Sequence, residues 1–168
     1  FSAANFREAT FSGHADFIHA TFRGTVDFYN AIFAARADFG ELICTVQTNF
    51  RGAVFRGEAD FASAEINKAA FSQATFRDVS FRETTFNGSS EFRDAGFCGK
   101  ADFSHAKFKD KAYFHKTKFD DEANFLSATF SSAADFWEAK FRNRTNFQAA
   151  TFKKAEIMGE TFLVDAVA

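Results

Sequence analysis

The spacing of phenylalanine constrains the fold of this chain more than any other feature. All 28 Phe residues follow one register, in which neighbouring repeat centres are alternately five and six residues apart. Three centres lack Phe and carry Cys44, Ile66 or Ile157 instead. Two residues before most centres stands Ala, and Val, Thr or Ser fills most of the rest. A repeat that runs from Phe1 to Phe162 predicts a solenoid, in which each coil packs on the next.

The length of the repeat indicates how each coil is built. A period near five with one large and one small apolar residue fits neither an α-helix nor a long strand. It fits a chain that turns a corner every five residues, with Phe and the small residue inside. Coils stacked about 4.8 Å apart then pair backbone to backbone as in a β-sheet. The absence of Pro suits such a ladder, because nearly every N–H must donate.

The six-residue spacings predict two bulged corners in each coil. The extra residue recurs in every second unit, so with four units per coil the bulges lie at opposite corners of a square. From Phe61 to Phe86 the spacing falls to plain fives, which predicts a plainer coil near the middle with a solvated, charged outer face. We expect Asp16, Asp27 and Asp38 to accept hydrogen bonds from backbone N–H groups at the bulged corners.

Glycine is expected at corners because only glycine adopts positive φ without strain. Seven of the nine Gly residues stand two positions after a centre: Gly13, Gly24, Gly52, Gly57, Gly88, Gly99 and Gly159. At Cys44 the missing Phe is matched by Leu42 in place of the usual small residue, which we interpret as a conservation of core volume.

The unit resembles that of the pentapeptide-repeat proteins, which have a small residue, Asp or Asn, a central Leu or Phe, and two variable positions. Here AlaAspPhe begins at residues 15, 37, 59, 101 and 134, and AlaAsnPhe at residues 4 and 123. The resemblance covers essentially the whole chain. It implies an all-β fold, a right-handed quadrilateral β-helix with four units per coil and hence about eight coils.

We divide the chain into a β-helix over residues 1–162 and a short apolar tail over residues 163–168. The end of a β-helix exposes unpaired backbone and core, so it must be covered. We expect the tail to be either a cap or half of a homodimer interface. The candidate residues are Phe162, Leu163, Val164 and Val167.

Nothing in the sequence indicates an enzyme. The four His residues are scattered, the carboxylates belong to the repeat, and neither a phosphate-cradling glycine motif nor a nucleophile elbow is present. A Phe-filled interior also leaves no room for a substrate. We therefore predict no catalytic residue, no metal ligand and no cofactor.

Composition narrows the partners and the compartment. A net charge of −2 does not suit a strongly basic nucleic-acid binder, so we expect no nucleic-acid partner. Cys44 and Cys98 are too few for a disulfide scaffold, which favours free thiols in a reducing compartment. The sequence has no apolar run long enough to span a membrane. We expect a bacterial cytoplasmic protein, or one part of a longer or membrane-anchored chain.

One stretch of the surface stands out as a candidate for partner binding. Residues 100–118 are rich in Lys, and the four-unit coil places Tyr113 and Trp137 on the same face in adjacent coils. The candidate surface consists of Lys111, Tyr113, His115, Lys116 and Trp137. Aromatic rings surrounded by Lys suit an anionic or acidic partner, although the same residues also fit a solvated surface without a partner. Ile32 and Val54 form a second candidate patch, unless they serve only as strand formers.

Three functions fit these features. The first is a rigid, non-catalytic structural or interaction module with an unidentified protein partner. The second is implied by the resemblance, because some pentapeptide-repeat proteins resemble B-form DNA and bind type II topoisomerases such as gyrase. That function needs a strongly acidic rod, yet residues 61–120 contain ten Lys and Arg against eight Asp and Glu. The third is ice binding by Thr ladders, which are interrupted here by Lys107, Lys118, Lys140 and Glu65.

Overall fold

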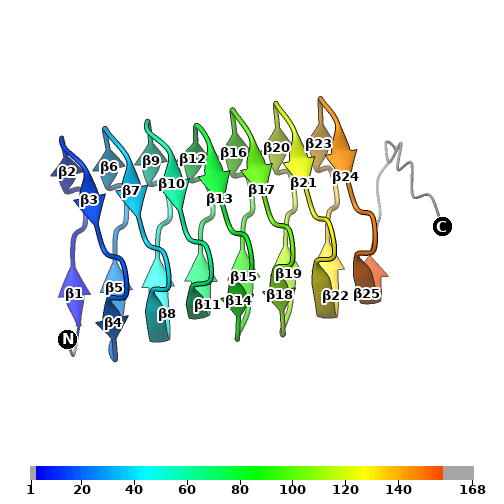
Figure 1. The fold of residues 1–168 in the computed structure, drawn as a ribbon, viewed down its shortest axis with the longest axis horizontal. Helices are drawn as coiled ribbons and strands as arrows, with labels where there is room; N and C mark the ends of the chain where they lie inside the picture. The colour runs from blue at the N-terminus through cyan, green and yellow to red at the C-terminus, as the bar shows by residue number, and fades with distance from the viewer. Residues whose placement is uncertain (1–2, 157–168) are drawn as a thin grey trace.

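The structure, a computed structural model, describes residues 3–156. These residues form an elongated stack of parallel coils, shown in Figure 1 from the N-terminal coil to the last described coil. Two of the sheets hold seven strands, one from each coil, so the described part has about seven coils. The tail residues Phe162, Leu163, Val164 and Val167 lie outside the described residues, and both interpretations of the tail stay predictions.

The strands pair in parallel from coil to coil, and those of the first and last coils pair on one side only among the described residues. One seven-stranded sheet, the β2 face, contains β2 (Thr10–Phe11), β6 (Ile32–Phe33), β9 (Val54–Phe55), β12 (Thr75–Phe76), β16 (Gly96–Phe97), β20 (Lys118–Phe119) and β23 (Lys140–Phe141). The other, the β3 face, contains β3 (Ala15–Asp16), β7 (Ala37–Asp38), β10 (Ala59–Asp60), β13 (Val79–Ser80), β17 (Ala101–Asp102), β21 (Ala123–Asn124) and β24 (Thr145–Asn146).

The third sheet has eleven strands and covers the two remaining sides of the coil, because four of its strands continue around the corner between them. Those four are β8 (Ile43–Asn49), β11 (Glu65–Ala70), β22 (Thr129–Asp135) and β25 (Thr151–Glu156). The β4 face consists of their first halves with β4 (Thr21–Phe22), β14 (Thr85–Phe86) and β18 (Lys107–Phe108). The β1 face consists of their second halves with β1 (Ala4–Asn5), β5 (Val26–Asp27), β15 (Ser90–Glu91) and β19 (Ala112–Tyr113).

The strand register confirms the predicted coil and its plainer middle. Ala15 pairs with Ala37, one coil of 22 residues further on. Ala59 pairs with Val79, so the coil in the middle is two residues shorter. The plain fives between Phe61 and Phe86 therefore remove one residue at each of two corners, as the spacing indicated.

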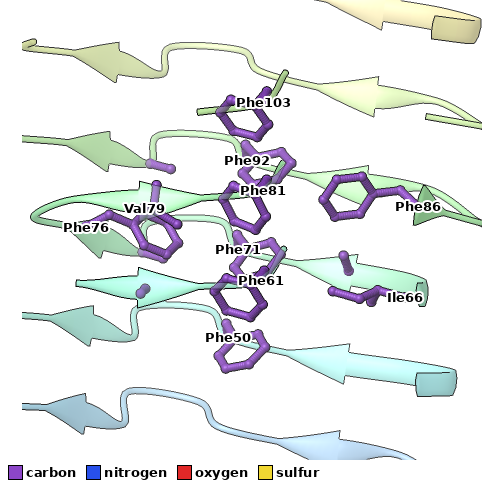
Figure 2. Close-up of a cluster of buried hydrophobic side chains, with 14 of the residues drawn as sticks. Phe50, Phe61, Ile66, Phe71, Phe76, Val79, Phe81, Phe86, Phe92 and Phe103 are labelled. Atoms are coloured by element: carbon purple, nitrogen blue, oxygen red, sulfur yellow. The ribbon is translucent and has the colours of Figure 1, made fainter. Parts of the chain in front are cut away.

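The core is four columns of stacked Phe rings. Within a column, rings of successive coils are nearly parallel, as in the pair Phe33 and Phe55, whose centroids are 4.6 Å apart. The columns of the β1 and β3 faces also meet edge to face along the axis: Phe61 lies 5.4 Å from both Phe50 and Phe71, at 87° and 84°. Figure 2 shows this zigzag, with Phe76 and Phe86 on its two sides. Each such pair adds about 0.5–1.5 kcal/mol beyond the burial of its area.

One column is interrupted by smaller residues. On the β4 face the successive centres are Phe22, Cys44, Ile66 and Phe86, and all four are buried. Leu42 is 1% exposed and belongs to the same buried core as Cys44, as the predicted exchange of volume between the two positions requires. Burial raises the pKa of the Cys44 thiol, which keeps it protonated.

The coil has two kinds of corner, which we call tight and wide. Tight corners connect the β1 face to the β2 face and the β3 face to the β4 face, and all have five-residue spacing. In the tight corner after Phe17, the Ala20 N–H donates to the Phe17 carbonyl at 3.0 Å, and His19 has φ +55°. These are the features of a type II turn. Wide corners connect the other pairs of faces and carry the extra residue wherever one is present.

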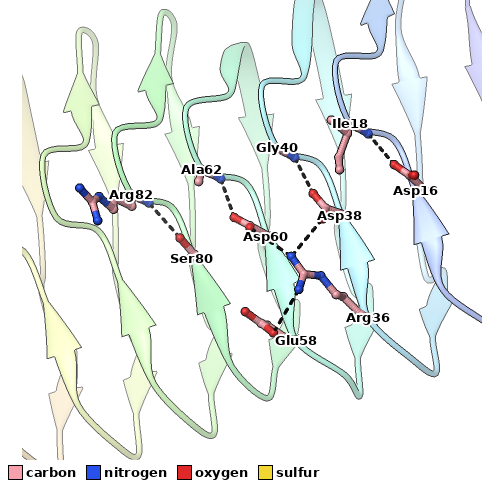
Figure 3. Close-up of polar contacts among 10 residues, drawn as sticks. All are labelled: Asp16, Ile18, Arg36, Asp38, Gly40, Glu58, Asp60, Ala62, Ser80 and Arg82. Carbon is pink, nitrogen blue, oxygen red and sulfur yellow. Dashed lines mark hydrogen bonds and ion pairs between the residues drawn. The ribbon is translucent and has the colours of Figure 1, made fainter.

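The Asp and Asn residues directly before a repeat centre serve the tight corners, so the prediction that Asp16, Asp27 and Asp38 serve the bulged corners was wrong. Asp16, Asp38 and Asp60 each accept the N–H of the residue two positions later, at 2.9–3.0 Å, as Figure 3 shows. Ser80 accepts a longer bond of 3.4 Å at the same position. The carboxylate follows the bulge in sequence, but its acceptor oxygen faces the turn that comes after it.

The explanation predicted for glycine holds at Gly52 and is wrong for the other described glycines. Among the described residues, thirteen non-glycine residues have positive φ, at the third position of tight corners, and Gly52 is the one glycine that does. Gly57 and Gly99 lie at wide corners, where the coil before approaches closely. A Cβ on Gly57 would lie 2.4 Å from the Ala35 carbonyl carbon, and one on Gly99 would lie 2.3 Å from the Arg77 carbonyl oxygen. Gly159 lies outside the described residues.

Candidate functional site

The structure places the aromatic members of the predicted site on the β1 face. Tyr113 ends β19 and pairs in register with Asp135 of β22. Trp137 lies two residues beyond Asp135, at the start of the following tight corner, where its backbone N–H donates to the Asp135 Oδ1 at 2.9 Å. Tyr113 and Trp137 are thus one coil apart on the same face.

Trp137 is the centre of a small cluster. This residue is 37% exposed, and the His115 ring lies against it at a centroid distance of 4.5 Å and an interplanar angle of 29°. The Lys116 ammonium lies 5.5 Å from the centroid of the Trp137 ring and 3.6 Å from the Glu138 carboxylate. A cation over an indole face is attracted by the ring quadrupole. The cluster therefore presents an aromatic surface beside positive charge.

Tyr113 is covered by a residue that the sequence did not single out. The Arg93 guanidinium lies 4.5 Å from the centroid of the Tyr113 ring, and its Nε is 3.0 Å from the Glu91 Oε2. Arg93 comes 22 residues before His115, so it holds the same repeat position one coil earlier. That spacing is the signal by which it can be found. Lys111 is exposed at the wide corner before β19 and forms no ion pair with a described residue.

A second cation and ring pair lies at the other end of the same face. The Arg7 guanidinium is 4.4 Å from the centroid of the Tyr29 ring and also binds Asp27 at 3.0 Å. Arg and aromatic residues thus recur along the β1 face, whereas the one Trp of the sequence lies near the C-terminal end of that face.

The other candidate residues do not form a site. Ile32 and Val54 pair in register on the β2 face and are half-buried. Among the side chains that the structure describes, no group of three or more His, Cys, Asp or Glu is arranged to hold a metal ion. His19 lies 3.3 Å from Glu41, and both side chains are largely exposed. No helix in the described part of the chain is long and apolar enough to cross a membrane.

The fold and the repeat together define a β-solenoid repeat protein. A sequence profile described as pentapeptide repeats in nine copies matches residues 1–43, 50–96 and 97–140. Because these matches cover most of the sequence, the chain belongs to the pentapeptide-repeat family. The resemblance seen in the AlaAspPhe units is thereby confirmed.

The remaining comparisons add little. No functionally curated protein matches the chain. Among solved structures, a trypsin-treated variant of QnrB1, a plasmid-mediated fluoroquinolone resistance protein, is 14% identical over 90% of each chain, with a TM-score of 0.19. A score this low carries no argument about function.

Proposed function

We propose that this chain is a non-catalytic interaction module that binds an acidic protein surface through the β1 face around Trp137. The observation that carries the proposal is the exposed Trp137 ring, stacked on His115 and bordered by Lys116. Trp, Tyr and Arg are the residues that most often dominate binding energy in protein interfaces. The rod supports this role because its Phe core holds neighbouring coils in fixed register.

The charge near the cluster suggests the character of the partner. His115, Lys116 and Arg93 are donors around two aromatic rings, and the nearby carboxylates Glu91 and Glu138 pair with Arg93 and Lys116. An acidic partner competes for those cations and gains the aromatic contact as well. Such complementarity chiefly raises the association rate and the selectivity.

The test compares Trp137→Ala with Ile18→Ala. Ile18 is a matched control, because it is 42% exposed and holds the same repeat position on the opposite face. Proteins captured from an extract of the source cells should be lost with Trp137→Ala and Tyr113→Ala but retained with Ile18→Ala. For an interface anchor we expect a loss of about 2 kcal/mol or more, about thirtyfold in Kd. Equal capture by all variants, each with an unchanged circular dichroism spectrum, would remove this face from consideration.

The topoisomerase hypothesis stays a separate prediction. It needs a continuous acidic surface, whereas the middle of the β1 face carries Arg51 and Arg93. Inhibition or protection of gyrase in a supercoiling assay at micromolar protein would support it, and no effect would end it.

A further inference from the structure

A hollow of about 510 Å³ opens on the β1 face near the middle of the rod, away from Trp137. It lies across three coils, with Arg51 on one side, Ser72 in the central coil and Arg93 on the other side. We call it the Ser72 hollow. No pocket was predicted there, because the charged residues of this stretch were interpreted as a solvated face.

The hollow follows from a missing residue. The wide corner between Ile66 and Phe71 has five-residue spacing, whereas the same corner in the coils before and after has six. The strand register records the loss as a shift between Ile66 and Lys68. The outward residues that follow, Ala70 and Ser72, are also small. A shorter corner with small side chains therefore lies recessed between two longer corners.

The lining of the hollow consists mainly of hydrogen-bond donors. Its polar side chains are those of Gln47, Asn49, Arg51, Lys68, Ser72, Ser89, Glu91 and Arg93. Glu91 is the one carboxylate among these lining residues, and Arg93 already binds it at 3.0 Å. Arg51 and Lys68 form no ion pair with any side chain that the structure describes. The hollow thus has positive charge that the described chain leaves uncompensated.

The donors that line the hollow come from three successive coils. Arg51 and Arg93 lie two coils apart, about 10 Å at sheet spacing, with the Ser72 hydroxyl in the coil between them. Lys68 approaches from the neighbouring corner. One guanidinium group can donate two parallel N–H bonds to two oxygens of a phosphate, and an ammonium adds a point charge. This arrangement suits a tetrahedral group with three acceptor oxygens better than a planar carboxylate with two.

We infer that the Ser72 hollow binds a phosphate group carried by a small molecule. The hollow is larger than inorganic phosphate alone, which leaves room for an attached organic group. Binding there depends on Arg51 and Lys68 and does not require Trp137, although Arg93 lines the hollow and also covers Tyr113 of the partner surface. It weakens with ionic strength, because the hollow is open to solvent and its charges are screened.

The experiment is calorimetric titration of the whole chain at low ionic strength, with inorganic phosphate and with glycerol 3-phosphate as probes. We expect both to bind, glycerol 3-phosphate more tightly, and Arg51→Gln to weaken binding about tenfold. Arg56→Gln is the matched control, since Arg56 is an exposed Arg of the β2 face without an ion pair among the described residues. It changes the net charge equally and should alter Kd less than about twofold.

A second variant tests the shape of the hollow and keeps every cation. Insertion of one Gly between Asn67 and Lys68 restores the six-residue corner and should abolish binding while the circular dichroism spectrum is kept. Trp137→Ala should leave phosphate binding unchanged, so failure here is distinct from failure of the partner surface. Absence of binding at millimolar phosphate, or equal effects of Arg51→Gln and Arg56→Gln, would overturn the inference. Binding of inorganic phosphate without any gain from glycerol 3-phosphate would contradict its small-molecule part.

Discussion

The tight and wide corners solve the same problem, a turn between two faces, in different ways. Each tight corner has five-residue spacing and a turn with one positive φ. Most of these turns are fixed by the side chain of an Asp or Asn. The wide corners vary in length, and in several coils they bring the backbone of one coil against the next. The constant corners hold the register of the stack, so the variable corners are free to shape its surface.

The two kinds of corner also differ in how they treat a buried hydroxyl. After tight corners, Thr84 and Thr117 donate to the carbonyls of Phe61 and Phe92 at 2.7 and 2.9 Å. After a wide corner, Ser90 Oγ is buried without a hydrogen-bond partner in the described chain. The hydroxyls of Thr84 and Thr117 are thus accommodated in the small inward position, whereas that of Ser90 costs stability.

The largest effect is expected from a side chain added at a wide corner. In Gly57→Ala the new Cβ meets backbone atoms of Ala35 and Arg36, which have no freedom to rotate away. Overpacking of this kind costs about 1–3 kcal/mol. The urea midpoint, followed by circular dichroism, should fall clearly. Gly96→Ala is the control, because no atom lies within 4 Å of its Cβ position; an equal fall in both variants would contradict the close-approach explanation.

Smaller effects, opposite in sign to each other, are expected from removal of the buried hydroxyls of Ser90 and Thr84. Ser90→Ala removes an unpartnered hydroxyl and should raise the free energy of unfolding by about 1 kcal/mol. Thr84→Val removes a hydrogen bond to the Phe61 carbonyl and should lower it by about 1 kcal/mol. Thermal unfolding of both variants gives the two signs directly. A loss of stability in Ser90→Ala would show that its hydroxyl has a bound water as partner.

The smallest effect concerns the backbone itself. Ser127 has φ +55° in a tight corner, so Ser127→Gly should relieve strain and stabilise the rod by about 0.5–1 kcal/mol. Ser131→Gly, in the extended strand β22, should instead destabilise by a similar amount because Gly loses more freedom on folding. Urea midpoints that move in the same direction would show that backbone conformation does not distinguish the two positions.

The repeat predicted the coil and the core well because both depend on residue size at fixed spacing. Phe and Ala alternate where large and small side chains must interlock, so the stack follows directly from the sequence. The Asp hydrogen bonds and the positive φ values were predicted at the wrong corners, because the residue type does not reveal the backbone φ. His19 and Lys116 adopt positive φ without the glycine that usually reports it.

The candidate site shows the same division. Trp137 and His115 were predicted to be neighbours from the coil length alone, and they are in contact. Arg93 was missed because it lies outside the Lys-rich stretch, although it shares the repeat position of His115. The Ser72 hollow was missed because it arises where one corner is a residue shorter than the same corner in the coils on either side. The short spacing indicates a recess only when the three corners are compared.

The spacing between successive coils is constant, so the number of coils between two residues sets their distance along the axis. Ser72 and Trp137 hold the same position in the repeat three coils apart, which sets them about 14 Å from each other along the axis. Duplication or deletion of a whole coil between them changes that separation by one coil spacing, about 4.8 Å, and leaves the local structure of both intact. Distances along such a rod therefore change in discrete increments, one for each coil gained or lost.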